Sequence, residues 1–482
     1  QGNKVKQIRI YNSLTNKKEN LTTQEFKKIK MYACGVTVYD ECHIGHAMQA
    51  IFFDVIRKFL EHCGYEVVYV RNYTDVDDKI INRAKRENIT CKELSEKMIR
   101  SSREDMKNIG VSPASFEPRV SDSIDDIILM IETLIKKRFA YVTKTGDVYF
   151  RVKNKNNYGC LSNRKIEEML SGVRSIHKGD KEHSLDFALW KNDNSSDASW
   201  DSPWGVGRPG WHIECSVLAK KYLGDSFDIH GGGRDLLFPH HENEIAQSEA
   251  ANDSPYASHW LHSGLLTIEQ QKMSKSLGNH ITIKSFLKTW DAEVLRYSYL
   301  CNHYRSNIDF SEDVFKLARK RLFYYYQTLI SLDNMGKDAL NSKVKDDEKK
   351  IIDVFKKTFM DSMCDDFNTP QAVAALNVLI RKVNGMLNKA TKKEYKYYLY
   401  AQAIREVCSV LGLLQRHPDD FIGTQVDAIL CDLGITRNQI QDKIKDRNIA
   451  RDNKDWFLSD KIRDELIEKG IVLKDLQGET KW

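Results

Sequence analysis

The sequence predicts an α/β fold: a Rossmann-like parallel-sheet domain with an insertion, followed by an all-helical bundle and a small C-terminal domain. Three observations predict it. A strand–helix–strand pattern covers residues 31–70, a second α/β stretch covers 201–265, and almost all of the chain after Phe315 has helical periodicity. At roughly 150 residues per domain, a chain of 482 residues is long enough for about three domains.

The first α/β unit is a βαβ motif. The apolar run Met31–Ala33 predicts a buried strand, apolar residues recur at helical spacing over 44–60, and Tyr65–Val70 predicts a second strand. A βαβ unit implies a parallel sheet with right-handed crossovers, and such sheets bind ligands beyond the carboxyl ends of their strands. Binding groups are therefore expected in 34–46 and 72–78.

The rest of the chain divides by its pattern of residues. Ile124–Ile135 predicts an amphipathic helix within an insertion, and Thr369-Pro370 predicts a helix start in the bundle, with Thr369 as N-cap. We expect the following segments: 1–118, first half of the α/β domain; 119–200, insertion; 201–265, second half; 266–320, a loop-bearing linker; 321–416, helical bundle; 417–482, C-terminal domain.

Composition excludes several classes of protein. Lys+Arg of 74 against Asp+Glu of 68 leaves a net charge of +6, too small for a histone-like binder, although local patches can still meet a polyanion. The 10 cysteines include no C-x-x-C pair, which argues against zinc ribbons and favours a reduced, cytoplasmic protein. No apolar run approaches the length of a membrane span, so no membrane contact is expected.

Two histidines lie at the start of the first predicted helix, in the sequence His43-Ile44-Gly45-His46. A helix N-terminus offers free N–H groups and the positive end of a dipole, which suit phosphate, and Gly45 leaves room for a ligand. Imidazoles there can stabilise charge that develops on a phosphoryl group. Taken alone, the four residues fit two ordinary histidines at a helix cap equally well.

A lysine-rich loop is the second signal, Lys272-Met273-Ser274-Lys275-Ser276. Two ammonium groups three residues apart would bind a triphosphate as point charges. A solvated basic turn is the commoner explanation of such a loop by itself. Both motifs together, in this order and on this fold, point to nucleotide chemistry.

Four residues have a spacing that suits a metal. His240 and Glu244, at i and i+4, project from one face of a helix, and Cys34 and Cys215 would complete a Cys₂HisGlu set of the kind zinc binds tetrahedrally. From spacing alone, a capped helix and two buried thiols is the favoured interpretation.

The sequence resembles the class I aminoacyl-tRNA synthetases, whose signatures are HIGH and KMSKS, and within them the cysteinyl-tRNA synthetase family. The resemblance runs from about Ile8 to Trp482. The stretches that carry it are Tyr32–Asp40, Pro209–Ser216, His230–Leu236, Phe238–Glu244 and Asp366–Pro370. It implies that the α/β domain is catalytic, that 266–320 holds the KMSKS loop and a stem-contact region, and that 417–482 binds the anticodon.

The resemblance also implies roles for individual residues. One Zn²⁺ per chain would be held by Cys34, Cys215, His240 and Glu244. ATP would be bound by His43, Gly45, His46, Gly232, Asp235, Lys272 and Lys275, of which the two histidines and two lysines are catalytic. The cysteine pocket would include Thr37, Thr74 and Trp211. The anticodon would be contacted by Arg451, Trp456, Asp460 and Asp475.

Three residues beside these positions have open roles. His241 and Glu242 are as well suited to orient the ligands as to be ligands, and His212 is equally well explained as a core histidine. The basic, aromatic stretch Lys316–Tyr326 either lies along an RNA backbone or packs its aromatic face inward, the second being the more common arrangement.

The implied reaction joins cysteine to tRNA(Cys). ATP, with Mg²⁺ on its phosphates, would convert cysteine to cysteinyl-adenylate and pyrophosphate, and the terminal adenosine of the tRNA would then accept the cysteinyl group. We expect a monomer. Two rivals are a ligase of the same fold that joins cysteine to an amino-sugar acceptor and a non-catalytic RNA-binding paralogue. The 451–475 region argues against the first and the intact motifs against the second.

Overall fold

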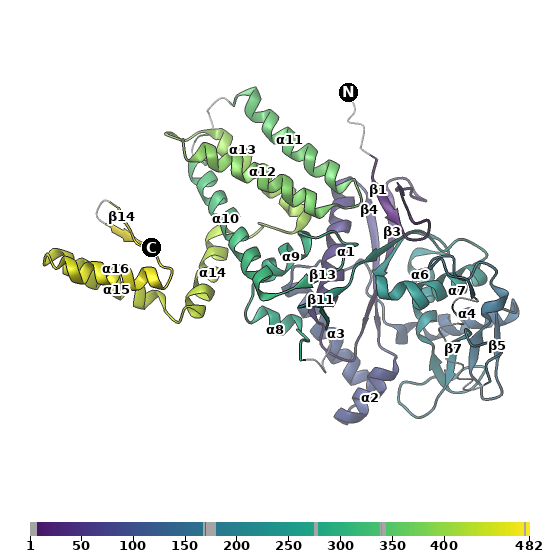
Figure 1. Cartoon of the computed structure of the whole chain (residues 1–482). Helices are drawn as coiled ribbons and strands as arrows, with labels where there is room; N and C mark the ends of the chain where they lie inside the picture. The colour runs from purple at the N-terminus through teal and green to yellow at the C-terminus, as the bar shows by residue number, and fades with distance from the viewer. Residues whose placement is uncertain are drawn as a thin grey trace.

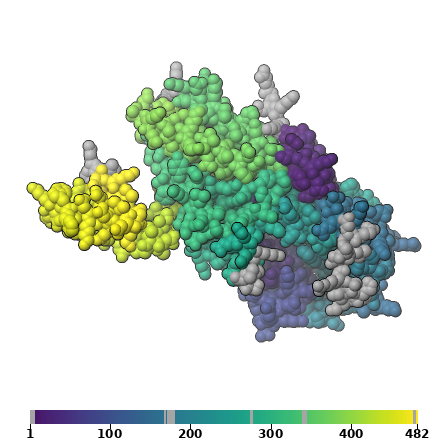
Figure 2. Space-filling view, viewed as in Figure 1, coloured from purple at the N-terminus to yellow at the C-terminus, as the bar shows by residue number. Residues whose placement is uncertain are grey.

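The chain forms an α/β body, a helical bundle against it, and a small C-terminal lobe that extends away from the bundle (Figure 1). The structure, a computed structural model, describes residues 7–166, 169, 180–273, 278–337, 339, 344–476 and 479–482. The space-filling view shows the C-terminal lobe as a separate yellow projection at one end of the molecule (Figure 2). The predicted fold class is confirmed.

A four-stranded parallel sheet lies at the centre of the α/β body, in the order β10-β9-β3-β4. Its strands are β3 (Lys28–Thr37), β4 (Glu66–Thr74), β9 (Phe227–Gly233) and β10 (Ala257–Ser263). The helices connected to it are α1 (Ile44–His62), α2 (Asp78–Glu87), α3 (Cys91–Asn108), α6 (Trp211–Leu223) and α7 (Glu242–Asn252). The two central strands, β3 and β9, come from the two halves of the predicted domain.

The pairing of β3 with β4 shifts register between Ala33 and Val36. This irregularity leaves the backbone of Cys34 and Gly35 outside the regular ladder, close to the carboxyl end of the strand. Bulges of this kind re-aim a side chain next to functional sites. The bulge therefore sets the direction of Cys34.

The insertion carries its own antiparallel sheet, in the order β5-β6-β7-β8. Its elements are α4 (Ile124–Lys136), β5 (Ala140–Val142), β6 (Val148–Phe150), β7 (Phe187–Asn192) and β8 (Gly207–Pro209), with 3₁₀ turns at Val120–Ser123 and Val152–Asn154. Because β8 closes this sheet, the insertion's structure continues past residue 200, and the chain runs from it directly into α6. An N-terminal hairpin, β1 (Arg9–Asn12) and β2 (Lys17–Asn20), packs beside the body.

Short elements link the sheet to the bundle. They are β11 (Leu266–Ile268), β12 (Gln271–Lys272), α8 (Ile283–Leu287), α9 (Ala292–Leu300) and β13 (Ile308–Phe310). The bundle contains α10 (Glu312–Gly336), α11 (Asp346–Met363), α12 (Thr369–Leu387), α13 (Tyr395–Leu411) and α14 (Pro418–Asp432). The C-terminal lobe contains α15 (Arg437–Asp452), α16 (Trp456–Glu468), β14 (Lys474–Leu476) and β15 (Glu479–Lys481). The expected boundary at 320/321 thus falls inside one continuous helix, α10.

Separate apolar cores hold these parts together. One continuous core joins one face of the sheet to the bundle, from Ile10 through Phe59 to Leu411. A second fills the space between the other face and the insertion, a third packs α2 and α3, and a small fourth core stabilises α15 and α16. Within the described residues, no helix has both the length and the apolar character needed to cross a membrane.

Candidate active site

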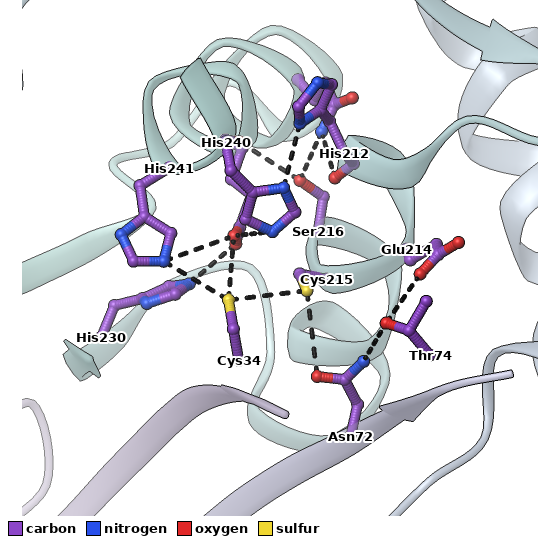
Figure 3. Close-up of polar contacts among 12 residues, drawn as sticks. Cys34, Asn72, Thr74, His212, Glu214, Cys215, Ser216, His230, His240 and His241 are labelled. Carbon is purple, nitrogen blue, oxygen red and sulfur yellow. Dashed lines mark hydrogen bonds and ion pairs between the residues drawn. The ribbon is translucent and has the colours of Figure 1, made fainter. Parts of the chain in front are cut away.

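Four potential metal ligands converge at the carboxyl end of the central strands (Figure 3). Cys34 comes from β3, Cys215 from α6, and Glu244 from α7, while His240 lies in the π turn Leu237–His241 that leads into α7. The two sulfur atoms are 3.7 Å apart, Cys34 Sγ is 3.4 Å from Glu244 Oε1, and His240 Nε2 is 3.0 Å from the same oxygen. The four ligand atoms all lie within 4.8 Å of one another and are buried, so the group is able to hold a metal ion.

The electrostatics of this group fit a cation. A hydrogen bond from the Cys34 thiol lowers the pKa of Cys215 to about 6. Burial opposes ionisation of Glu244, yet contacts with His230 and His240 hold its pKa well below its usual range. Buried anionic sulfur and carboxylate groups are costly unless a cation compensates them. Thiolate, imidazole and carboxylate together are a donor set that zinc accepts.

Further histidines surround the group. His230 Nε2 lies 2.7 Å from Glu244 Oε2, and His241 Nε2 lies 3.3 Å from Cys34 Sγ. On its other side, His241 Nδ1 is 2.8 Å from His262 Nε2. Cys34, His230, His241 and Glu244 also meet the distance criterion for a metal group. Neither His230 nor His262 has a role predicted from the sequence; the position of His230 directly before the Gly231–Gly233 run was the available signal.

His212 and Glu242 contact different parts of this region. His212 Nδ1 lies 2.9 Å from His240 Nδ1, on the side of the ring away from Glu244. Glu242 faces the insertion instead, where its carboxylate accepts hydrogen bonds from the backbone N–H groups of Gly159 and Ser162 at 2.9 and 2.8 Å. His212 is thus placed to orient a ligand, and Glu242 ties α7 to the insertion.

The residues expected in the amino-acid pocket lie around the same edge. Thr37 and Thr74 pair with each other at the ends of β3 and β4. Thr74 Oγ1 donates to Glu214 Oε2 at 3.2 Å. Trp211 is 41% exposed and stacks on the His240 ring with centroids 4.2 Å apart. Trp211 therefore borders the metal group, and the two threonines lie at the ends of β4 and of β3, the strand that carries Cys34.

His43 and His46 form a compact cap at the start of α1. His43 Nδ1 accepts hydrogen bonds from the N–H groups of Gly45 at 3.1 Å and His46 at 3.3 Å, and His46 Nδ1 accepts from His43 N–H at 3.2 Å. Burial lowers the pKa of His43 to about 4 and that of His46 to about 3. A neutral imidazole that accepts at Nδ1 carries its proton at Nε2. Both rings are therefore set to donate Nε2–H to a ligand.

The segment after the lysine-rich loop is joined to this cap by backbone hydrogen bonds. Ile44 N–H donates to Ile281 O at 3.0 Å, and Ile283 N–H donates to Cys42 O at 2.9 Å. The backbone of Lys272 lies in β12, whereas Lys275 is outside the described residues. The structure thus joins the chain that follows the KMSKS sequence to the helix that carries the histidines.

Gly232 lies near the carboxyl end of β9, and Asp235 lies just after it. Gly232 is buried near the end of β9, and a Cβ placed there would lie 2.7 Å from the His241 ring. Asp235 is exposed in the 3₁₀ turn Arg234–Leu236 that follows β9. Because the backbone of Gly232 lies this close to the His241 ring beside the metal group, there is no space for a side chain at residue 232.

The four residues expected at the anticodon are all in the C-terminal lobe. Arg451 Nη1 lies 3.1 Å from Asp475 Oδ2, and Arg447, which the sequence analysis missed, donates to both Asp475 oxygens at 2.9 Å. Trp456 is 59% exposed at the start of α16, and the Asp460 side chain is exposed on the same helix. The structure brings Arg451 and Asp475 together.

In the Lys316–Tyr326 stretch, Tyr325 and Tyr326 are fully buried. The Tyr325 hydroxyl donates to Asn377 in the bundle, and the Tyr326 hydroxyl donates to Glu293 in α9. The inward packing of this aromatic face is therefore the arrangement found.

The chain matches two family descriptions. Residues 20–320 match the catalytic domain of class I (C) tRNA synthetases, and residues 358–415 match the DALR domain. The first match covers more than half of the chain and includes the metal group and the histidine cap. The chain belongs to the class I cysteinyl-tRNA synthetase family.

Relatives extend the match to the whole chain. The chain is 45% identical to the cysteine–tRNA ligase of Thermodesulfovibrio yellowstonii, over 98% of this chain and 99% of that protein. It is 46% identical to the cysteine–tRNA ligase of Geobacter sulfurreducens, with the same coverage. Mycobacterium tuberculosis methionyl-tRNA synthetase in complex with methionyl-adenylate has a similar fold: TM-score 0.61, 14% identity, 86% of this chain and 95% of that chain covered. The predicted family is confirmed.

Proposed function

We propose that this protein is a cysteine–tRNA ligase. It would activate cysteine with ATP to cysteinyl-adenylate and pyrophosphate, then transfer the cysteinyl group to the terminal adenosine of tRNA(Cys). The observation that carries the proposal is the buried group of Cys34, Cys215, His240 and Glu244 at the sheet edge, next to an amino-acid pocket bordered by Trp211. Its relatives of nearly equal length are cysteine–tRNA ligases.

Zn²⁺, one per chain, would be held by those four residues. When bound, zinc would serve as a recognition element that favours the thiolate of the substrate cysteine over a hydroxyl, because thiolate is the better zinc ligand. Trp211 would form the wall of the pocket, and Thr37 and Thr74 would orient the substrate. Selection by a bond that serine cannot form reduces the need for an editing site.

His43 and His46 would act on the phosphates of ATP. Each Nδ1 is held by backbone N–H, so each Nε2–H is directed away from its own helix cap. Donation to the phosphates would stabilise charge as the carboxylate of cysteine attacks the α-phosphorus. Lys272 and Lys275 would add positive charge, and Mg²⁺ would accompany ATP. Gly45, Gly232 and Asp235 would complete the nucleotide site by close backbone approach and by binding the ribose.

The C-terminal lobe would bind the anticodon. Exposed Trp456 would stack on an unpaired base, while Arg451, Asp460 and Asp475 would hydrogen-bond base edges. We propose that the α/β body activates cysteine and that residues 417–482, which include the C-terminal lobe, select the tRNA. We propose that the protein acts as a monomer in the cytoplasm.

One assay tests the function. Purified protein is given cysteine, ATP, Mg²⁺ and tRNA with a GCA anticodon, and both ATP–pyrophosphate exchange and charged tRNA are measured. We expect both activities, with exchange lost when zinc is removed and restored when zinc is returned. Exchange without charging of tRNA would support the amino-sugar ligase instead, and loss of both would support a non-catalytic RNA-binding protein.

A further inference from the structure

Asn72, at the end of β4, contacts the chain around both cysteines of the metal group (Figure 3). Its Oδ1 accepts a hydrogen bond from Gly35 N–H at 3.0 Å and lies 3.9 Å from Cys215 Sγ. Its Nδ2 donates to Thr74 Oγ1 at 3.4 Å. Asn72 is 1% exposed, so its amide is committed to these partners.

The bulge in β3 explains why a side-chain amide is needed here. Between Ala33 and Val36 the ladder with β4 is interrupted, so the peptide between Cys34 and Gly35 lacks ladder partners. Two side-chain amides take their place: Gln49 Nε2 donates to Cys34 O at 3.2 Å, and Asn72 Oδ1 accepts from Gly35 N–H at 3.0 Å. The peptide that carries Cys34 is therefore held at both ends.

Gly35 makes this arrangement possible. A Cβ at residue 35 would lie 1.5 Å from the backbone carbonyl oxygen of Asn72, so only glycine allows β3 to approach β4 this closely at the bulge. At this approach the Asn72 amide oxygen contacts both Gly35 N–H and Cys215 Sγ. Asn72 also lies on the same face of β4 as Thr74, two residues along the strand.

From Thr74 the contacts continue to α6. Thr74 Oγ1 donates to Glu214 Oε2 at 3.2 Å, and Glu214 directly precedes Cys215. Asn72 is therefore linked to Cys215 in two ways. One is direct contact, and the other is the chain of hydrogen bonds through Thr74 and Glu214. Asn72 reaches Cys34 through the peptide of Gly35.

We propose that Asn72 is a positioning residue that sets the two cysteine ligands and the Thr74 hydroxyl relative to one another. This inference rests on the proposed zinc site. Without the amide, Gly35 N–H would lose its acceptor, Cys215 Sγ would lose a contact, and Thr74 Oγ1 would lose its hydrogen-bond donor. Metal affinity and cysteine binding would then change, and ATP binding would not.

The test compares the full-length unmodified protein with Asn72→Ala, Gln49→Ala and the isosteric Asn72→Asp. Zn²⁺ affinity is measured by competition with a chromophoric chelator, and the Co²⁺-loaded proteins are compared by their thiolate-to-cobalt absorption. The KM for cysteine and the KM for ATP are measured in pyrophosphate exchange. Asn384→Ala is the matched control, since Asn384 donates to Tyr324 and Thr328 within the bundle.

We expect Asn72→Ala to bind Zn²⁺ about 10–100-fold more weakly, the usual effect of losing a partner of a metal ligand. Its cobalt absorption should shift, and its KM for cysteine should rise while its KM for ATP stays constant. Gln49→Ala should weaken zinc binding less, because it frees only the Cys34 carbonyl. Asn72→Asp keeps the shape of the side chain, and its carboxylate should repel the two thiolates and weaken zinc binding as well.

Two results separate this inference from the proposed function. If the unmodified protein binds no zinc, the proposed zinc site is wrong, and the inference falls with it. If the unmodified protein binds zinc while Asn72→Ala and Asn72→Asp keep its zinc affinity, cobalt absorption and KM for cysteine, the inference alone is overturned.

Discussion

The guanidinium of Arg296 lies 3.0 Å from the carboxylate of Asp54, and both side chains are buried. This ion pair joins α9 to α1, the helix that has His43 as its N-cap. Arg296 also donates to the backbone carbonyls of Gly110 at 2.7 Å and Leu411 at 3.2 Å. A single cation therefore connects the α/β body, the linker and the end of α13.

Removing the anion of this pair should be strongly destabilising. Asp54→Asn leaves the buried charge of Arg296 without its counter-ion, which costs about 3–5 kcal/mol in comparable cases. Urea unfolding measures the loss. The control is Asp346→Asn, which breaks the exposed pair with Lys349 and should stay within about 0.5 kcal/mol. An equal effect of the two substitutions would contradict the assigned role of the buried pair.

Stability should fall in mild acid because of the histidine cap. The pKa of His43 is about 4 and that of His46 about 3 in the folded protein, against 6.5 for the free side chain. Between pH 6.5 and 4 the unfolded chain binds protons that the folded chain does not, so the free energy of unfolding decreases as pH falls through this range. Above pH 6.5 these two groups contribute no pH dependence.

Urea titrations at pH 7.5 and 5.0 measure this fall in stability. His46→Gln should make it smaller, because one of the two groups is removed. His62→Gln is the matched control, since His62 lies on the same helix but is exposed. A fall that is unchanged in His46→Gln would count against the assignment.

Zinc binding should depend on the sulfur atoms of both Cys34 and Cys215. Cys215→Ser should bind Zn²⁺ at least about 100-fold more weakly, because even the partners of metal ligands contribute 10–100-fold. Zinc content after dialysis and pyrophosphate exchange with cysteine report the effect. Cys431→Ser, at an exposed cysteine, should match the unmodified protein. Full zinc retention by Cys215→Ser would rule out Cys215 as a ligand.

The C-terminal lobe should affect tRNA and leave activation of cysteine intact. Trp456→Ala should lower kcat/KM for tRNA by about 5–150-fold, since stacking of one base on an aromatic ring contributes about 1–3 kcal/mol. Pyrophosphate exchange should not change. Phe26→Ala removes an aromatic ring that is 92% exposed on the α/β body, and it serves as the control. If both variants charge tRNA normally, base stacking by Trp456 is excluded.

The fold followed from the sequence wherever a local pattern determined it. The βαβ unit and the helical bundle were predictable because burial of one face requires a fixed spacing of apolar residues. Thr369-Pro370 located the start of α12 to within one residue; the cap is Asn368, whose side chain accepts from Gln371 N–H at 3.2 Å. Local chemistry thus identifies helix ends well.

The sequence could not show which segments that are far apart in the chain contact one another. The boundary expected at residue 320 falls inside α10, because helical periodicity does not change where a helix passes from one domain to the next. Asn72 and Arg447 were missed because each acts through residues far along the chain, Gly35 and Cys215 for the first and Asp475 for the second. The bulge that makes Asn72 necessary has no local sequence signal other than Gly35.

The pairing of β3 with β9 also sets the order of events during protein synthesis. Cys34 and Glu244 are 210 residues apart in the chain. At the usual rates of translation, this separation corresponds to about 10 to 40 seconds between the synthesis of the two residues. Cys215 is made 181 residues after Cys34, and His240 and Glu244 follow it, so through most of that interval the nascent chain carries the Cys34 thiol alone. The metal centre can therefore be completed only after the ribosome has made Glu244 in α7, when β10, the last strand of the sheet, is still to be synthesised.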